Sequence, residues 1–457
     1  MERGQVLLLV TFAIVGIIAI MGLALDVGVM FIENARLRRA VDAAALAAAL
    51  QFREGYTTTD LDRSAQEFLI LNGIHDPHAT VDTCSTDATL CTNPQRKLVR
   101  VVARATAPLA FLPVIGIDSA PIGAMAVSET ASVDVVLVID RSESMTYDAA
   151  VGNSMRDPFE CNASSASPQG YVGDCEPFNT VKDAAISFVN QLYFPYDRVA
   201  VVTFDQKPNV LLHFSNVKAT VVSTIANLTV FQGDETFGSP PGATAIYPNG
   251  NPSRFYDGGG TYLGLGCPQY TLTGLTPAAC TTTNIGGGLM LAGDEFAVPP
   301  VRQQSLWVVI LLTDGVANGG YGANPSPPPN LLYYCPLTTW SNAISAPWVF
   351  PKCNDSTSHT RHNPVGNPDY DAEDFAYDMA DFIGQPAPVG QNALLFTIGL
   401  GQQVTAQSIV DNTPIGELFL QYAATTGNGL YYDAPNSSDL REIFRKIAEN
   451  IATRLAK

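Results

Sequence analysis

Charged residues are scarce in this chain of 457 residues, and basic residues are the scarcest. Asp, Glu, Lys and Arg make up 15% of the sequence, below the ~25% usual in soluble globular proteins, so Ser, Thr, Asn, Gln and Tyr supply much of its polarity. Only 25 Lys and Arg stand against 43 Asp and Glu, a formal net charge of -18. Such a chain is poorly suited to bind nucleic acid or anionic lipid headgroups through a basic patch. We expect no nucleic-acid partner, and ligands that are neutral, cationic or bridged by a metal ion.

Several signatures of zinc sites and nucleotide sites are also missing. The two His-x-x-His pairs, at residues 75–78 and 359–362, lack the Glu of His-Glu-x-x-His, and we interpret them as surface histidines. The triple glycines at 258–260 and 286–288 do not form a Gly-x4-Gly-Lys-Ser/Thr loop, so they give little support for phosphate binding.

One long uncharged run, from Gly4 to Leu25, predicts a membrane segment. As a helix, residues 6–25 would cross the ~30 Å hydrocarbon core of a bilayer. A cleaved signal peptide would have a shorter apolar core, whereas here the pattern continues past Asp26 into the Ala-rich stretch 43–50. We therefore expect residues 1–55 to form an uncleaved transmembrane anchor with a continuing helix. Cleavage remains an alternative, because Ala-rich stretches can mimic peptidase sites.

The eight cysteines fall into four consecutive close pairs, each in loop-like sequence. Zinc sites use Cys-x2-4-Cys or mixed Cys/His sets, and these spacings do not fit, so we predict four local disulfides and an oxidising compartment. The arginines that follow the apolar run argue for the opposite orientation, but long domains translocate largely regardless of such charges. The predicted pairs are Cys84 with Cys91, Cys161 with Cys175, Cys267 with Cys280, and Cys335 with Cys353.

The rest of the chain divides into two regions. Helix is expected to continue from residue 26 to 72, and short antiparallel strands then complete a small α+β, pilin-like segment over residues 56–131. From residue 132 to 457, buried strands alternate with amphipathic helices, which predicts an α/β fold with a doubly wound, mostly parallel sheet. The expected strands are 133–140, 198–204, 210–214 (at an edge), 306–312 and 394–398, and the expected helices are 179–192, 217–228, 284–296, 371–383 and 439–455.

Three long insertions interrupt the α/β region, at about residues 146–178, 232–282 and 317–370. Each contains one of the predicted disulfides and lies next to the carboxyl end of a strand. Ligands of open parallel sheets bind beyond these strand ends. We therefore expect the insertions to form the rim of a binding site.

Oxygen-bearing side chains follow two of the predicted strands. Asp140, Ser142 and Ser144 stand at alternate positions after the first strand, Asp314 ends the 306–312 strand, and Thr283 precedes a helix. A hard cation such as Mg²⁺ prefers oxygen ligands and retains several waters. Such a set leaves the ion under-neutralised, so its free position would best be filled by a carboxylate from a partner molecule.

At these residues the sequence resembles the von Willebrand factor type A domain, with its metal-ion-dependent adhesion site of pattern Asp-x-Ser-x-Ser, then Thr, then Asp. The resemblance spans about residues 133–457 and implies a metal bound by Asp140, Ser142, Ser144, Thr283 and Asp314. Mg²⁺ is the expected ion, with Mn²⁺ and Ca²⁺ as alternatives. Thr244 competes with Thr283 for the threonine position, and a vestigial metal site is the alternative to a working one.

The N-terminal residues resemble TadG-like proteins of tight-adherence (Flp) pilus systems. Arg3-Gly-Gln-Val before the apolar run, Leu25-Asp-Val-Gly after it, and Ala35-Arg-Leu leading into Ala-rich sequence carry this likeness over about the first 55 residues. The two resemblances imply a single-pass protein of the bacterial cell envelope, associated with a pilus, whose C-terminal domain is extracytoplasmic.

Three functional hypotheses follow from the sequence. In the first, the chain is a surface adhesin that binds protein or extracellular-matrix ligands through the metal. In the second, it is a pilus-assembly or envelope-anchoring component that grips another pilus subunit. The third, a metal-dependent hydrolase, is disfavoured because no His or Lys base lies near the motif, and we expect the protein not to be an enzyme.

Overall fold

The computed structural model describes residues 3–148 except 54 and 76, 154–155, 158–163, 170–231 except 206 and 207, 283–317, 340–341, 352–353, 372–405 except 403, and 414–455. The chain divides into two compact units. The first is Met1–Ser132 with Leu455–Lys457, and the second is Val133–Arg454.

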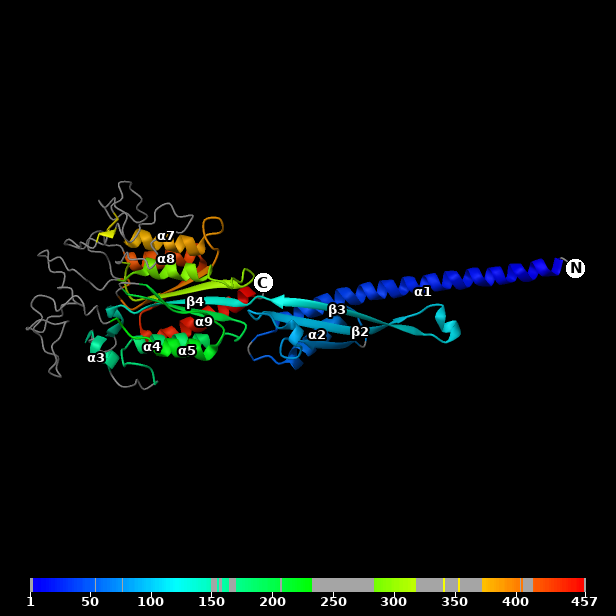
Figure 1. Cartoon of the computed structure of the whole chain (residues 1–457), viewed down its shortest axis with the longest axis horizontal. Helices are drawn as coiled ribbons and strands as arrows, with labels where there is room; N and C mark the ends of the chain where they lie inside the picture. Colours follow the sequence, from blue (N-terminus) through cyan, green and yellow to red (C-terminus); the bar gives the residue numbers. More distant parts are fainter. Residues whose placement is uncertain are drawn as a thin grey trace, which may run out of the picture. The chain divides into compact units, whose positions relative to one another are not determined.

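The first unit is built on one long helix, α1 (Arg3–Leu50), which packs against α2 (Thr58–Leu71) and a three-stranded antiparallel sheet (Figure 1). The sheet has the order β1-β2-β3, and the turns η1 (Ala88–Leu90) and η2 (Leu112–Ile115) connect its strands. The buried side chains of the C-terminal half of α1 are mostly alanines, which let the helix approach its neighbours closely. The strands are β1 (His78–Asp82), β2 (Lys97–Pro108) and β3 (Ser119–Thr130).

The prediction of unbroken helix from residue 26 to 72 is wrong. Helix α1 ends at Leu50, and Gly55 has a left-handed backbone conformation with φ +87° that interrupts helical geometry. Helix α2 then starts from its own N-cap, because Thr57 and Asp60 cap each other's backbone amides reciprocally. The Thr-x-x-Asp spacing was the signal in the sequence for this second start.

Among the residues that the structure describes, one helical stretch, Leu9–Leu50 of α1, is long and apolar enough to cross a membrane. From Leu9 to Leu25 every residue is exposed except Gly22. This part of α1 therefore lacks the protein cover that a core helix of this composition would have.

The second unit is a six-stranded sheet of order β13-β12-β9-β4-β7-β8, in which β8 is antiparallel and all other neighbours are parallel. The expected mostly parallel α/β sheet is confirmed, and β8 lies at an edge as predicted. The strands are β4 (Val133–Asp140), β7 (Arg198–Phe204), β8 (Asn209–Ser215), β9 (Leu306–Thr313), β12 (Leu394–Leu400) and β13 (Asn428–Ala434).

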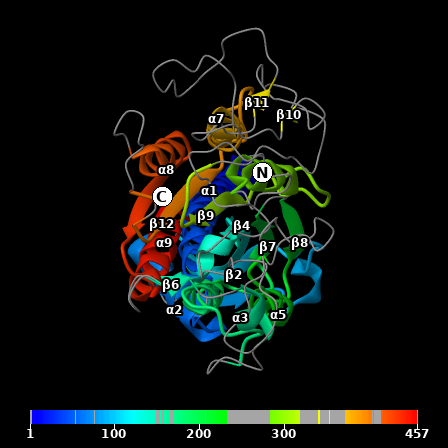
Figure 2. The same ribbon diagram turned by 90° about the vertical axis from the view of Figure 1, so that its left-hand side faces the viewer.

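Helices cover both faces of this sheet, as Figure 1 and the end-on view in Figure 2 show. One face carries α6, α7 and α8, whose apolar side chains form one buried cluster with the sheet. The other carries α4, α5 and α9, with Phe188 of α4 and Phe444 of α9 in ring contact at 5.7 Å. The helices are α4 (Phe178–Val189), α5 (Lys218–Ala226), α6 (Ile285–Glu295), α7 (Ala372–Gly384), α8 (Ile415–Thr426) and α9 (Leu440–Leu455).

One helix and one strand of this unit were not predicted, α8 and β13. Strand β13 is an edge strand whose residues are largely half-buried or exposed, so it lacks the continuous apolar run that marks the central strands. The remaining described elements of this unit are short: η3 (Glu143–Thr146), β5 (Tyr147–Asp148), β6 (Ser154–Met155), α3 (Pro158–Ala163), β10 (Trp340–Ser341), β11 (Lys352–Cys353) and η7 (Ser437–Asp439).

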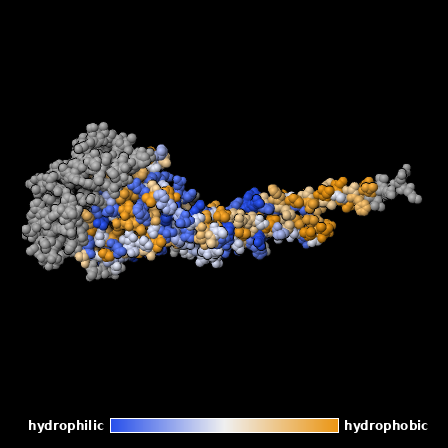
Figure 3. Space-filling model, viewed as in Figure 1, coloured by the Kyte–Doolittle hydropathy of each residue, from blue (hydrophilic) through white to orange (hydrophobic). Residues whose placement is uncertain are grey.

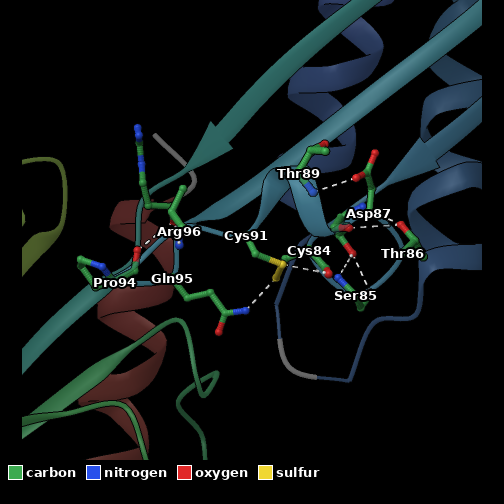
Figure 4. Close-up of a disulfide and its surroundings, with 11 residues drawn as sticks. Cys84, Ser85, Thr86, Asp87, Thr89, Cys91, Pro94, Gln95 and Arg96 are labelled. Atoms are coloured by element: carbon green, nitrogen blue, oxygen red, sulfur yellow. Dashed lines mark hydrogen bonds between the residues drawn. A yellow bond between two sulfur atoms is a disulfide. The ribbon is translucent and has the colours of Figure 1, made fainter.

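Two of the four predicted disulfides are present, Cys84–Cys91 and Cys161–Cys175. Figure 4 shows the first closing the turn between β1 and β2, where Gln95 donates to the sulfur of Cys84 at 2.8 Å. The second lies in the first predicted insertion.

The other two predicted disulfides stay predictions, and with them the idea that each insertion is braced by its own disulfide. Both cysteines of one pair, Cys267 and Cys280, lie outside the described residues. In the other pair Cys335 lies outside them, whereas Cys353 ends β11. Nearly all of the second and third insertions also falls outside the described part of the chain.

A buried ion-pair cluster stabilises the edge of the sheet where β4 begins. The Asp134 carboxylate, fully buried, accepts hydrogen bonds at 2.9 and 2.8 Å from Arg198 of β7 and also pairs with Arg302. Arg302 in turn donates to the backbone carbonyl of Tyr196 at 2.7 Å. Two buried arginines thus share the single negative charge of this carboxylate.

Replacing Asp134 with Ala should lower the free energy of unfolding of the second unit by about 3–5 kcal/mol, because two buried guanidinium groups would lose their counter-charge. Urea unfolding followed by tryptophan fluorescence would measure this, since all three tryptophans lie in that unit. Asp183→Ala is the matched control: its pair with Arg441 is exposed to solvent and should contribute little to stability. Equal losses in the two variants would contradict the assignment.

The Cys161–Cys175 bond joins α3 to the segment just before α4, and the loop that it closes contains no strand of the six-stranded sheet. We expect the Cys161→Ser/Cys175→Ser variant to become more sensitive to protease around residues 158–175 while the far-UV circular dichroism of the sheet persists. Closure of a loop of this length is worth ~3 kcal/mol in the chain-entropy model. Cooperative loss of the whole unit would show instead that the bond supports the sheet itself.

Candidate metal centre

The candidate site begins where β4 ends, at Asp140. This residue is fully buried, and both oxygens of its carboxylate are engaged. Oδ1 accepts the backbone N–H of Ser142 at 2.8 Å, and Oδ2 accepts the hydroxyl of Thr313, the last residue of β9, at 2.6 Å. The carboxylate therefore shapes the loop that follows β4 and ties this loop to the neighbouring strand.

The two serines of the loop link Asp140 to the second carboxylate of the motif. The Ser142 and Ser144 hydroxyls lie 2.9 Å apart, and Ser144 donates to Oδ1 of Asp314 at 2.7 Å, across 170 positions of sequence. Ser142 and Asp314 are both buried. The structure thus brings together four of the five predicted ligands in one hydrogen-bonded set.

Thr283 lies next to this set, immediately before α6. It is 7% exposed, and its hydroxyl would be 3.6 Å from a Cβ added at Gly315, the residue after Asp314. The following residue, Asn284, donates its backbone N–H to the carbonyl of Asp205 at the end of β7. Thr244, the competing threonine, lies outside the described residues.

Burial raises the pKa of both carboxyls, and the charge of a neighbouring acid raises each further, Asp205 acting on Asp140 and Asp140 acting on Asp314. Desolvation raises the pKa of Asp140 to about 6, against the lowering effect of hydrogen bonds from Ser142 and Thr313. Desolvation and the charge of Asp140 raise the pKa of Asp314 well above its usual range. Two acidic groups placed so close in a buried position would be stabilised by a cation between them.

Three further residues lie at this sheet edge that were not predicted from the sequence: Thr313, Asp205 and Arg141. Asp205 is 3% exposed and pairs with Nε of Arg141 at 2.8 Å, and its charge contributes to the raised pKa of Asp140. A signal was present, because Asp205 follows the buried strand β7 just as Asp140 ends β4. Carboxyl ends of parallel strands meet at the same edge of a sheet.

The first predicted insertion reaches the loop of the candidate site through two segments. Asn162 of α3 donates to the carbonyl of Val230 at 2.7 Å and accepts the backbone N–H of the same residue at 3.1 Å. The next residue, Phe231, donates its backbone N–H to the carbonyl of Arg141 at 2.7 Å. The Cys161–Cys175 bond therefore supports a segment bonded to the loop that carries the serines.

The side chains of the candidate site offer oxygen atoms as metal ligands. The described part of the chain also has no cluster of His or Cys that could bind a metal elsewhere. There, no group of three or more His, Cys, Asp or Glu side chains is arranged to bind a metal. His78 lies exposed at the start of β1, and His359 and His362 fall outside the described residues. The arrangement that remains is two carboxylates with hydroxyls, the ligand chemistry of hard divalent cations.

Two families match parts of this chain. Residues 4–51 match the family of Flp pilus-assembly, TadE/G-like proteins, and residues 135–240 match the von Willebrand factor type A domain. No curated protein matches the chain.

Solved structures similar to this chain include the von Willebrand factor domain of the type V pilus tip protein Mfa5 from Porphyromonas gingivalis, at 17% identity and TM-score 0.36, covering 72% of this chain and 97% of that one. A variant of the PilB minor pilin from Streptococcus sanguinis is similar at 15% identity and TM-score 0.37, with coverages of 83% and 79%. Proximal thread matrix protein 1 of the mussel byssus, with zinc at its metal-ion-dependent adhesion motif, is similar at 13% identity and TM-score 0.33. The match covers 70% of this chain and 48% of that one.

Because these TM-scores lie below 0.5 and the identities below 25%, the solved structures say nothing about what this chain binds. The family matches agree with the two parts of the chain that the sequence motifs and the fold distinguish. This chain combines an N-terminal TadE/G-like segment with a von Willebrand factor type A domain.

Proposed function

We propose that the second unit binds a divalent cation through Asp140, Ser142, Ser144, Thr283 and Asp314, and through that cation a carboxylate of a protein or matrix ligand. The observation that carries the proposal is the hydrogen-bonded set at the carboxyl edge of the sheet, in which Ser142 and Ser144 connect two buried carboxyls. A structural role alone gives no reason to leave two buried acids facing one another.

The residues present fit a hard divalent ion. Asp140 and Asp314 supply negative charge, and three hydroxyls supply neutral oxygens. When bound, the cation would supply a Lewis-acidic position for an incoming carboxylate. Mg²⁺ is the expected ion, with Mn²⁺ and Ca²⁺ as alternatives, because all three prefer oxygen ligands.

The N-terminal half of α1 supports a place in the bacterial cell envelope. Its residues from Leu9 to Leu25 are uncharged, mostly apolar and, except for Gly22, exposed, and the TadE/G-like match covers the same helix. The Cys84–Cys91 and Cys161–Cys175 bonds favour an oxidising compartment for both units. We infer a single-pass, pilus-associated protein whose second unit lies outside the cytoplasm and binds its ligand without chemical conversion.

A second candidate function uses the same site. The TadE/G-like family is described by its link to pilus assembly, so the second unit would bind another pilus subunit instead of a surface ligand. Both functions need a cation-dependent carboxylate contact. They differ in whether loss of the site removes pili or only attachment.

Divalent cation should stabilise the wild-type second unit, because the ion binds the folded state alone. A hundredfold excess of Mg²⁺ over its Kd would contribute ~2.7 kcal/mol. A domain of about 150–250 residues gains ~2–4 °C in Tm for each kcal/mol, and this larger unit should gain somewhat less. Thermal scans with Mg²⁺, with Mn²⁺ and with EDTA would measure the shift.

Asp314→Asn should abolish this cation-dependent shift and yet be at least as stable as the wild type in EDTA. The variant removes a charge that faces Asp140, and the side-chain oxygen of Asn can still accept from Ser144. An Asp183→Ala control should keep the full shift. If Asp314→Asn retained it, Asp314 would not belong to the cation site.

In the native host, the Ser142→Ala/Asp314→Ala variant should leave pili in normal number and strongly reduce attachment of cells to a surface. Both readouts, pili counted by electron microscopy and adherent cells, come from the same cultures. Ser187→Ala/Asp183→Ala makes the same changes on α4 and should alter neither. Loss of pili would support the assembly function instead, and no change in either readout would refute the proposed site.

A further inference from the structure

The turn between β2 and β3 is an uncharged, strongly apolar segment. Residues 109–117, which we call the apolar tip, read Leu-Ala-Phe-Leu-Pro-Val-Ile-Gly-Ile and include the turn η2. Val114 is 86% exposed and Ile115 71%, and Phe111 and Ile117 are also exposed. Exposed apolar patches of this kind mark contacts with a membrane or another protein.

Asp26 of α1 fixes the apolar tip against the anchor helix. Its carboxylate accepts hydrogen bonds from the backbone N–H groups of Ala110 at 2.6 Å, Phe111 at 3.0 Å and Leu112 at 2.8 Å. One turn earlier in α1, Gly22 is so close to the ring of Phe111 that an added Cβ would come within 2.8 Å of it. The tip therefore lies alongside residues 22–26.

Most backbone N–H groups of the apolar tip have partners within the protein. Besides the three amides bonded to Asp26, those of Leu109, Val114, Gly116 and Ile117 donate to carbonyls of residues 111–118. Position 113 is a proline, which has no amide hydrogen. Non-helical backbone can lie at membrane depth only when its polar groups have such partners.

The position of the tip along α1 corresponds to the end of a membrane span. Residues 6–25 of an α-helix cover about 30 Å, the thickness of the hydrocarbon core. Phe111 packs at Gly22, three residues or about 5 Å inside that end. Exposed apolar side chains of α1 continue to Ile32, so a span shifted toward that residue would place the tip deeper still.

We propose that the apolar tip enters the acyl-chain region of the bilayer beside α1, as a second membrane contact that Asp26 holds in place. The inference rests on the proposed anchor role of α1. Lipid is the occupant that the structure favours, because the exposed apolar surface of the tip continues directly onto that of the anchor helix (Figure 3).

Asp26 also explains how an acid is tolerated at this depth. A carboxylate on an apolar helix near the membrane is costly unless it has partners. Here the acid and the tip amides satisfy one another, and Asp26 is only 1% exposed. A hairpin bonded at this point would also fix the orientation of the first unit relative to the bilayer surface.

Depth-dependent fluorescence quenching in the full-length protein tests the proposal. We would introduce Val114→Trp and, separately, Leu71→Trp, each in protein reconstituted into phosphatidylcholine vesicles, and subtract the signal of the parent chain. Leu71 is 77% exposed in the same unit, near Gly73 and Arg36, ten residues or about 15 Å along α1 from Asp26. Vesicles with brominated acyl chains and aqueous acrylamide are the two quenchers.

The tryptophan at position 114 should lose fluorescence to brominated lipid and be protected from acrylamide, and the one at position 71 should show the reverse. Equal acrylamide quenching at both positions would overturn the proposal. Protection of position 114 from both quenchers at low protein-to-lipid ratio would also overturn it, since a protein would then cover the tip. Flotation of the vesicles separates these results from failure of the anchor itself, in which case the protein would not float.

The role of Asp26 is tested by adding Asp26→Asn to the Val114→Trp chain. The amide side chain offers one acceptor oxygen and two N–H donors to a tip that presents only donors here. We expect loss of brominated-lipid quenching and a gain in acrylamide quenching. Unchanged quenching in protein that still floats would overturn the assignment of Asp26 as the residue that holds the tip.

Discussion

The parallel pairing of β4 with β7 on one side and β9 on the other decides where the acids and hydroxyls that follow these strands lie in the candidate site. In this register Ile139 is opposite Leu312 and Asp140 is opposite Phe204, so Asp140 meets Thr313 and Asp205 at a common edge. All eight residues of β4 are buried. A slip of one residue would exchange the two faces of the strand, and the packing of helices on both faces opposes this.

Strand β4 carries an acidic residue near each end, and the two residues have different partners. Asp134 is paired with two arginines of the same chain, which meets the cost of burying its charge. Asp140 accepts hydrogen bonds from Ser142 and Thr313 and shares its surroundings with Asp314. The first acid belongs to a structural ion pair, whereas we propose that the second contributes its charge to the binding of a cation.

In the first unit, too, the partners of a buried acid decide its role. Helix α1 has an exposed apolar N-terminal half and an Ala-rich C-terminal half that is buried under a small sheet, and Asp26 lies between them. Its partners are backbone amides of a hairpin more than 80 residues away in the sequence. In the sequence, Asp26 only marks the end of an apolar run. In the fold, it joins the anchor helix to the hairpin.

The sequence by itself determined the apolar anchor run, the order of the buried strands, two local disulfides and the spacing of Asp140, Ser142 and Ser144. These features depend on residues close together in the chain, where periodicity and spacing are direct consequences of local geometry. Only the tertiary structure decided the break before α2, the edge strand β13, the approach of Asp205 and Thr313 to the site, and the bonding of Asp26 to the hairpin. Each of these depends on contacts between distant segments or on half-buried positions, whose pattern in the sequence is weak because packing and not local preference selects them.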